Sequence, residues 1–327
     1  MSLRIFHRSE AVIAAVLLLA MILIGLVNPA FWQLDNLFGL VRSNVVIGIM
    51  ALGVLMVLIS GGIDVSFPAF AVAAMYLTIR AMLALGYEGV ALPFAVATLI
   101  GAGLGAVNAV FVHYLRVIPL IVTLGTGAMV RGFLLGMVGA SQINIDRMPK
   151  PLIAFARSEL VGIGNSDGTH YGLTAMVVLY GALALLVHFV LRHTLVGRSI
   201  YALGGDAEAA RRVGFDLRRT TFFVYGAAGA LAGFAGLLHS SMIWLANPRD
   251  FAGLELDVIA AVVLGGASIF GGRGSVLGTL LGVFMLVMVN NSLIIMKIDT
   301  TWQRVVVGAI VIVATALTAW RDRKRRI

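Results

Sequence analysis

Residues 40–85 read LVRSNVVIGIMALGVLMVLISGGIDVSFPAFAVAAMYLTIRAMLAL, two apolar runs (40–60 and 65–85) separated by a short polar break. Each run is as long as the roughly 20 residues that an α-helix needs to cross a lipid bilayer. In the break, Gly61 and Gly62 favour the end of one helix, and Ser66 followed by Pro68 favours the start of the next. The stretch predicts two membrane-spanning helices, with Asp64 between them.

The composition extends this prediction to the whole chain. Of the 327 residues, 60% are hydrophobic and only 12% are charged, whereas soluble domains carry about 25% charged residues. We therefore expect an all-α multi-pass membrane protein with about ten transmembrane helices, forming a single transmembrane domain over residues 1–327. The apolar runs are 11–31, 40–60, 65–85, 90–112, 119–139, 171–191, 220–243, 255–271, 275–296 and 302–320. The break at 61–66 could be a loop, a re-entrant segment or a mid-helix kink, and the short run 255–271 could be re-entrant or partly unwound.

The distribution of basic residues predicts the orientation. The net charge is +9, but most of the 24 lysines and arginines lie in a few loops and in the tail RDRKRR. Cytoplasmic loops are enriched in Lys and Arg, and the count places both termini in the cytoplasm. Residues 140–170 then form a loop that faces outward and residues 192–219 a cytoplasmic loop. Basic residues in these positions indicate membrane orientation and not a nucleic-acid partner.

The sequence lacks the motifs of several function classes. It contains no cysteine and no G-x-x-x-x-G-K-[ST] loop, and its six histidines are scattered without metal-ligand spacing. No Ser/His/Asp arrangement stands out. We therefore expect no catalytic residue, no metal site and no cofactor. These expected absences argue against an enzyme.

The cytoplasmic loop contains a short helix signal. In LGGDAEAARRVGF (203–215), Asp206 can cap a helix that runs through Arg212, and Gly214 can supply a left-handed stop. The helix would have about two turns, which is marginal in water without tertiary support. It is either an ordinary connector packed on its own bundle or a docking helix held by a partner.

Several motifs together resemble one known family. Glu208, Ala209 and Ala210, followed by Gly214, resemble the EAA-type loop through which permeases of ATP-binding-cassette (ABC) importers contact their ATPase subunits. The order of motifs along nearly the whole chain resembles the monosaccharide branch of these permeases, the ribose, xylose and autoinducer-2 type. The matching motifs are SGGIDVS (60–66), ALGGDAEAARRVGF (202–215), GALAGFAGLL (229–238), LDVIAAVVLGGASIFGGRGSVLGT (256–279) and the basic tail. The chain departs from the branch at Phe67-Pro68, where members commonly have VG.

The resemblance implies a function and a set of partners. It implies a permease subunit, related in architecture to the vitamin B12 importer type, that moves a small sugar or sugar-like molecule across a bacterial inner membrane. The outward-facing loop 140–170 would then be periplasmic. The implied partners are a cytoplasmic ABC ATPase that hydrolyses ATP, a periplasmic sugar-binding protein, a second permease subunit that is either identical or paralogous, and membrane lipid. The residues that would couple to the ATPase are Gly205, Asp206, Ala207, Glu208, Ala209, Ala210, Arg211 and Gly214.

Polar side chains inside the apolar runs are candidates for the substrate pathway, because ionisable and polar groups at membrane depth are costly. The candidates are Asp64, Ser66, Asn108, Thr123, Thr126, Arg131 and Asn290. Structural roles compete in each case: Asp64 could cap a helix, Arg131 could pair with a carboxylate, and the asparagines could bond between helices. Asp64 at a Gly-rich break also leaves an alternative, an ion-coupled secondary transporter of a small polar solute.

Overall fold

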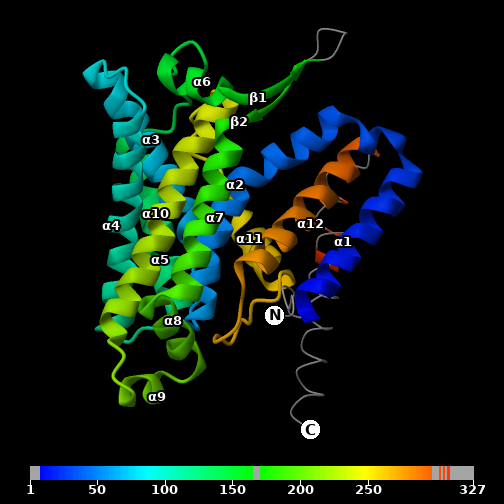
Figure 1. The fold of residues 1–327 in the computed structure, drawn as a ribbon. Coiled ribbons are helices and arrows are strands. Elements are labelled where there is room, and N and C mark those ends of the chain that lie inside the picture. Colours follow the sequence, from blue (N-terminus) through cyan, green and yellow to red (C-terminus); the bar gives the residue numbers. More distant parts are fainter. Residues whose placement is uncertain (1–7, 165–169, 297–301, 303–304, 306–307, 310–327) are drawn as a thin grey trace.

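The structure is a computed structural model that describes residues 8–164 and 170–296, together with 302, 305, 308 and 309. Most of the chain forms helices that run roughly along one direction, as Figure 1 shows. The elements are α1 (Arg8–Val27), the 3₁₀ turn η1 (Pro29–Trp32), α2 (Leu34–Ile59), α3 (Phe67–Leu85), α4 (Ala91–His113), α5 (Pro119–Phe133), the π-helical turn η2 (Leu134–Val138), α6 (Lys150–Arg157), β1 (Glu159–Gly164), β2 (His170–Thr174), α7 (Ala175–His193), α8 (Leu195–Gly205), α9 (Ala207–Arg212), α10 (Leu217–Ile243), α11 (Leu254–Leu264) and α12 (Val276–Ile295).

The described helices confirm an all-α multi-pass membrane protein. Within the described residues, 8 helices are long and apolar enough to cross a membrane. The tenth predicted run, 302–320, and the basic tail lie outside the described residues, apart from the four positions named above. A count of ten helices therefore stays a prediction.

The short run 255–271 is only partly helical. Helix α11 has 11 residues and ends at Leu264, which at 1.5 Å per residue is too short to span a bilayer. Gly266, Gly271 and Gly272 then take positive φ angles of 93°, 88° and 72°, so the chain continues without helix until α12. Of the two predicted alternatives, the structure shows the partly unwound one.

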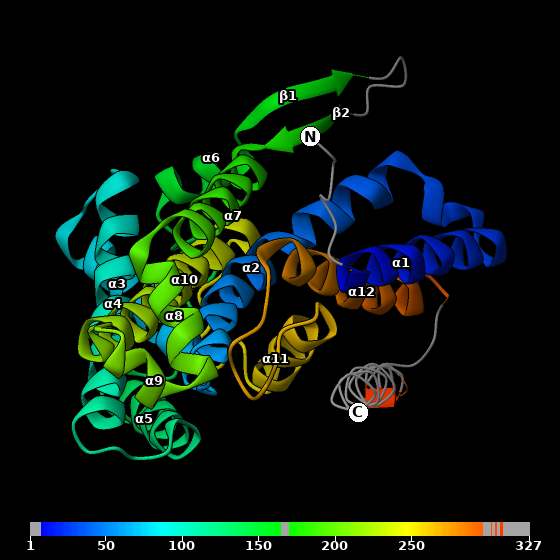
Figure 2. The same cartoon turned by 60° about the horizontal axis from the view of Figure 1, so that its bottom comes forward.

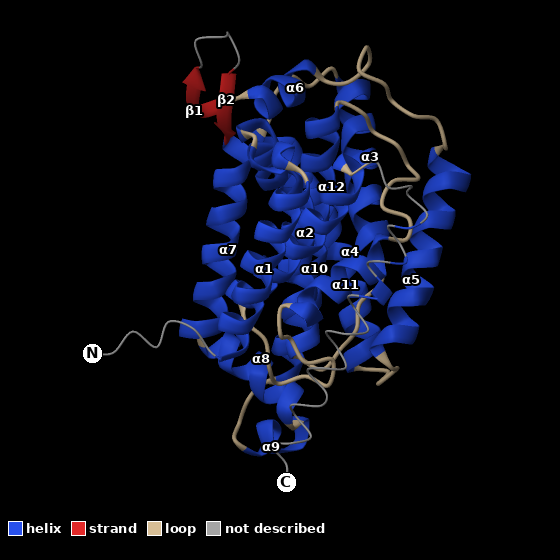
Figure 3. Ribbon diagram, turned by 90° about the vertical axis from the view of Figure 1, so that its right-hand side faces the viewer, coloured by secondary structure: helices blue, strands red, loops and turns tan. Residues whose placement is uncertain are grey.

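The interior of the bundle is built from α2, α3 and α10, which carry most of the buried residues. Helices α1, α4, α5 and α7 bury only 17–28% of the residues in their most apolar stretches, as expected for helices that face lipid. Figure 3 shows α2 and α10 in the middle of the bundle, with α7 and α5 at its two sides. Helix α1 packs on α12, which in turn packs on α2, and Figure 2 shows this pair beside the rest of the bundle.

Helices α4 and α10 meet backbone to backbone. A Cβ atom on Gly229 would overlap the carbonyl oxygen of Gly101, and one on Gly101 would overlap that of Gly229. A Cβ on Gly233 would overlap the carbonyl oxygen of Ala97. The small-residue spacing of the sequence thus corresponds to close helix packing here, since lipid gives helices no hydrophobic reason to associate.

We expect Gly229→Ala to destabilise the subunit by about 1–3 kcal/mol, the usual cost of overpacking a close interface. The added methyl group would contact backbone atoms of α4, and these atoms, unlike a side chain, cannot rotate out of the way. Gly226→Ala is the matched control, because that glycine lies on the same helix with nothing within 4 Å of its Cβ position. Thermal unfolding of the detergent-solubilised protein measures both variants. Equal melting temperatures for the two would contradict the packing assignment.

The two ends of the bundle differ. One end carries α6 and the antiparallel hairpin of β1 and β2, and the other carries α8 and α9 (Figure 1); we name them the hairpin end and the α9 end. The predicted outer loop, 140–170, thus contains a helix and a hairpin that runs on to Thr174.

Near the start of α1, Glu10 accepts a hydrogen bond from Ser275, and Ser275 is the N-cap of α12.

Candidate functional site

Helix α9 forms where the sequence predicts it. Asp206 takes the N-cap position, and its Oδ1 accepts hydrogen bonds from the backbone N–H groups of Glu208 at 2.9 Å and Ala209 at 3.0 Å. Gly214 has φ +95°, the left-handed conformation that ends a helix. The local residues therefore determine both ends of this helix.

The surface of α9 is largely open. Ala210 is its only buried residue, and α9 stands at one extremity of the bundle (Figure 3). Glu208 forms ion pairs with Arg211 at 3.0 Å and Arg212 at 3.4 Å. The hydrogen bond from Arg211 holds the pKa of the Glu208 carboxyl below its ordinary value, so this carboxylate is charged at neutral pH. A short charged helix exposed in this way is suited to contact another protein.

Helix α8 connects α9 to the break between α2 and α3 through glycines. The Gly272 N–H donates to the carbonyl oxygen of Ile59 at 2.8 Å. A Cβ on Gly204 would overlap that same oxygen and lie 2.7 Å from the Gly272 nitrogen, and a Cβ on Gly271 would lie 2.9 Å from the Cα atoms of Gly204 and Gly61. We call Gly61, Gly204, Gly271 and Gly272 the glycine junction. It brings three segments that are distant in sequence into backbone contact.

The break between α2 and α3 is a short loop. Gly61, with φ +83°, ends α2, and its N–H donates to the carbonyl oxygen of Leu58 at 2.9 Å. The loop lies at the α9 end, because Gly61 is part of the glycine junction. The structure thus favours the loop among the three predicted alternatives.

Asp64 is 2% exposed and organises the start of α3. Its Oδ1 accepts hydrogen bonds from the Ser66 N–H at 2.7 Å and the Ser66 hydroxyl at 2.6 Å. The prediction that Ser66 itself caps α3 is wrong for its side chain: Ser66 holds the N-cap position but makes no side-chain cap hydrogen bond. Its backbone is already helical at φ −86° and ψ −19°, and its hydroxyl bonds to Asp64 instead.

Five of the predicted pathway residues join in one hydrogen-bonded network. Asn108 Nδ2 donates to the Ser66 hydroxyl at 2.9 Å, and Thr126 donates to Asn108 Oδ1 at 2.7 Å. The Val65 N–H donates to the Thr123 hydroxyl at 3.2 Å. The network of Asp64, Ser66, Asn108, Thr123 and Thr126 ties the break to α4 and α5. Because its members bond to one another, this geometry supports a positioning role, and contact with substrate stays a prediction.

The two remaining candidates lie apart from this network. Arg131, on α5, pairs with Glu255 Oε1 at 3.2 Å and also donates to the carbonyl oxygen of Phe251. The sequence left two roles open for Arg131, a place in the substrate pathway and a pair with a carboxylate, and the structure shows the pair. This ion pair links α5 to the first turn of α11. Asn290 lies on α12, a helix that contributes no member to the network.

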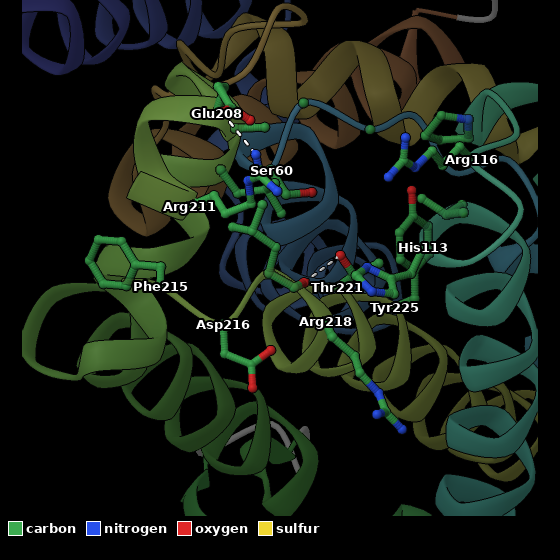
Figure 4. A pocket seen from close by; sticks show the side chains of 17 residues that line it. Ser60, His113, Arg116, Glu208, Arg211, Phe215, Asp216, Arg218, Thr221 and Tyr225 are labelled. Carbon is green, nitrogen blue, oxygen red and sulfur yellow. Dashed lines mark hydrogen bonds and ion pairs between the residues drawn. The ribbon is translucent and has the colours of Figure 1, made fainter. Parts of the chain in front are cut away.

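A pocket of about 780 Å³ opens at the α9 end. Figure 4 shows Glu208, Arg211 and Ser60 on one side, His113 and Arg116 on the other, and Thr221 and Tyr225 between them. The lining residues are Ser60, Gly61, Gly62, Val112, His113, Arg116, Pro119, Leu203, Ala207, Glu208, Arg211, Phe215, Asp216, Leu217, Arg218, Thr221 and Tyr225. The pocket therefore borders both α9 and the break.

The sequence predicts α9 and singles out the members of the polar network, but it predicts neither α8 nor the glycine junction. A signal for the junction was present. Adjacent glycine pairs occur at 61–62, 204–205, 265–266 and 271–272, and three of these four pairs supply the junction. Nothing in one sequence says that such pairs meet, because the contact depends on how the helices pack.

Comparison with known proteins gives consistent results. A family model described as "Branched-chain amino acid transport system / permease component" matches residues 36–315. The chain is 31% identical over 312 residues to the ribose import permease protein RbsC of Escherichia coli strain K12, covering 93% of this chain and 91% of the relative. It is 32% identical over 310 residues to RbsC of Bacillus subtilis strain 168, covering 94% and 91%. It is 32% identical over 307 residues to the autoinducer 2 import system permease protein LsrC of Enterobacter sp. strain 638, covering 94% and 85%. No solved structure matches the chain.

Proposed function

This chain belongs to the family of permease components of branched-chain amino acid transport systems, as a multi-pass inner-membrane permease subunit of an ABC importer, and we propose that its cargo is a small sugar or sugar-like molecule. Relatives that cover more than nine tenths of the chain are named for ribose import, and another is named for autoinducer-2 import. The subunit itself is not an enzyme. Family membership implies an ATPase and a substrate-binding protein as partners in general.

We propose that α9 is the helix on which the ATPase docks. The observation that carries this proposal is a capped, charged, exposed helix at one extremity of an apolar bundle. The α9 end is then cytoplasmic, as are both termini, and the hairpin end faces the periplasmic sugar-binding protein. A second permease subunit, identical or paralogous, completes the pathway, and residues 1–327 form one permease domain. A relation to the vitamin B12 importer fold remains part of this proposal.

The structure offers a physical route from α9 into the membrane. A displacement of α9 moves α8, because only Asp206 separates the two helices. Helix α8 touches the break through the glycine junction, and the break is bonded through the polar network to α4 and α5. Because packed backbones cannot slide freely past one another, these segments would move together.

Reconstitution tests this function directly. The purified permease, with its ATPase and binding protein, should hydrolyse ATP faster when the binding protein carries sugar, and vesicles should take up sugar only with ATP. The ion-coupled alternative is not favoured by the relatives. It would require uptake driven by a pH or sodium gradient without ATP, and that result would overturn the proposal.

We expect Gly214→Ala to lower transport several-fold and to loosen the link between hydrolysis and transport. At φ +95° a Cβ atom is strained, and such a conformation costs a non-glycine residue about 1–3 kcal/mol. The helix stop would shift and misplace α9. Sugar transported per ATP hydrolysed measures the effect. Gly103→Ala, in open space on α4, serves as control, and an unchanged ratio in Gly214→Ala would contradict the docking role.

A further inference from the structure

The pocket at the α9 end carries positive charge that its own carboxylates do not neutralise. Glu208 is bonded to Arg211 and Arg212, and Asp216 pairs with Arg219 at 3.0 Å. Among the described residues, Arg116 has no carboxylate within ion-pair distance, and Arg218 lies over the Tyr114 ring at 5.4 Å. Both arginines line the pocket, together with His113. A ligand with negative charge would meet these side chains.

The inner part of the pocket has an unused hydroxyl group. Tyr225 is 2% exposed, and its buried hydroxyl has no hydrogen-bond partner in the described structure. An unpaired buried polar group costs free energy, so a partner is expected there. The Tyr225 oxygen packs against Gly62, because a Cβ on Gly62 would lie only 2.6 Å from it. Thr221 donates its hydroxyl proton to the Leu217 carbonyl at 2.8 Å, so its oxygen is left to accept.

Two kinds of contact are thus combined in one cavity: cationic side chains and hydroxyl groups. Its volume of about 780 Å³ falls within the range of small-molecule sites, about 300–1,000 Å³. Arginine is the side chain best matched to phosphate oxygens. We propose that this pocket binds a phosphate ester of a small polyol, with its phosphate at Arg116 and its hydroxyl groups at Tyr225 and Thr221.

Two sources can supply this chemistry: a soluble sugar phosphate, or the phosphoglycerol headgroup of phosphatidylglycerol. Either ligand would contact the break at Ser60 and Gly62 and α9 at Glu208 in the same pocket. It would therefore hold α9 and the break together and slow transport. The expected slowing of transport rests on the proposed function, whereas binding of the phosphate ester to the pocket does not.

The full chain in phosphatidylcholine nanodiscs, titrated with D-ribose 5-phosphate by calorimetry, tests the proposal without any ATPase. Ribose 5-phosphate should bind at least about tenfold more tightly than ribose or inorganic phosphate alone, because a hydrogen bond to a charged group contributes this much. Arg116→Gln and Tyr225→Phe should each weaken binding about tenfold. Arg198→Gln, an exposed arginine of α8 outside the pocket, should have no effect, and melting temperatures check that each variant is folded.

Nanodiscs that contain phosphatidylglycerol distinguish the two sources. If this lipid displaces ribose 5-phosphate and Arg116→Gln abolishes the displacement, the headgroup is the natural occupant. If the lipid does not compete, the soluble ester is the occupant. Failure of both ligands to bind, or binding that is unchanged in Arg116→Gln, would overturn the proposal. Because the permease is measured alone, these outcomes are independent of whether sugar import is demonstrated.

Discussion

Gly204→Ala is expected to lower ATP-driven transport about 5- to 150-fold while the subunit remains folded in the membrane. Gly204 lies near the end of α8, directly before the helix on which we propose that the ATPase docks. A Cβ atom there would overlap the carbonyl oxygen of Ile59, at the end of α2. The substitution therefore separates α8 from the break through which movement of α9 reaches the membrane.

The effect should be large because every atom at this contact belongs to the backbone. The added methyl group would also lie 2.7 Å from the Gly272 nitrogen, whose N–H bonds to Ile59 at 2.8 Å. No side chain can rotate away, so the backbones must part at a cost of about 1–3 kcal/mol. A coupling free energy of about that size corresponds to a 5- to 150-fold change in coupling between two sites.

Uptake into proteoliposomes and ATP hydrolysis, measured on the same preparation, check this expectation. Hydrolysis should persist while stimulation by the loaded binding protein is lost. Gly181→Ala on α7 is the matched control, since nothing lies within 4 Å of its Cβ position. Full transport by Gly204→Ala would mean that the glycine junction does not carry the movement.

The features that the sequence predicts well are those determined by neighbouring residues. Apolar runs long enough for a bilayer become helices, Gly61 ends α2, and Asp206 with Gly214 bounds α9. Each follows from backbone geometry or from one side chain bonding to a nearby amide. The pairing of Arg131 with a carboxylate was also anticipated, although its partner, Glu255, lies 124 residues away.

The features that escaped prediction depend on contacts between distant segments. Asn108 reaches Ser66 across 42 residues and Val65 reaches Thr123 across 58, and no local pattern reports such a pairing. The role of Ser66 was misassigned for a related reason. Sequence spacing favours a serine cap, but the buried Asp64 carboxylate competes for the hydroxyl group.

Asp64→Ala is expected to destabilise the break severely, and through it the whole subunit. Asp64 Oδ1 accepts two hydrogen bonds from Ser66 at 2.7 and 2.6 Å in a site that is almost fully buried. Alanine leaves both donors without a partner, and each buried unsatisfied group costs about 1–3 kcal/mol. The Ser66 hydroxyl would also lose the bond that fixes its position against Asn108, which loosens the link to α4.

Asp64→Asn separates this positioning role from a substrate role, because asparagine keeps one accepting oxygen for Ser66 while it loses the charge and exchanges the second oxygen for an NH2 donor. If Asp64 acts by holding Ser66, the asparagine variant should recover most of the melting temperature and most of the transport that alanine loses. Asp35→Ala, an exposed acid in the first turn of α2, controls for the loss of a carboxylate. A fully stable Asp64→Ala protein that transports no sugar would contradict the positioning role, because the hydrogen bonds to Ser66 would then contribute little to the fold and the carboxylate would act in transport itself.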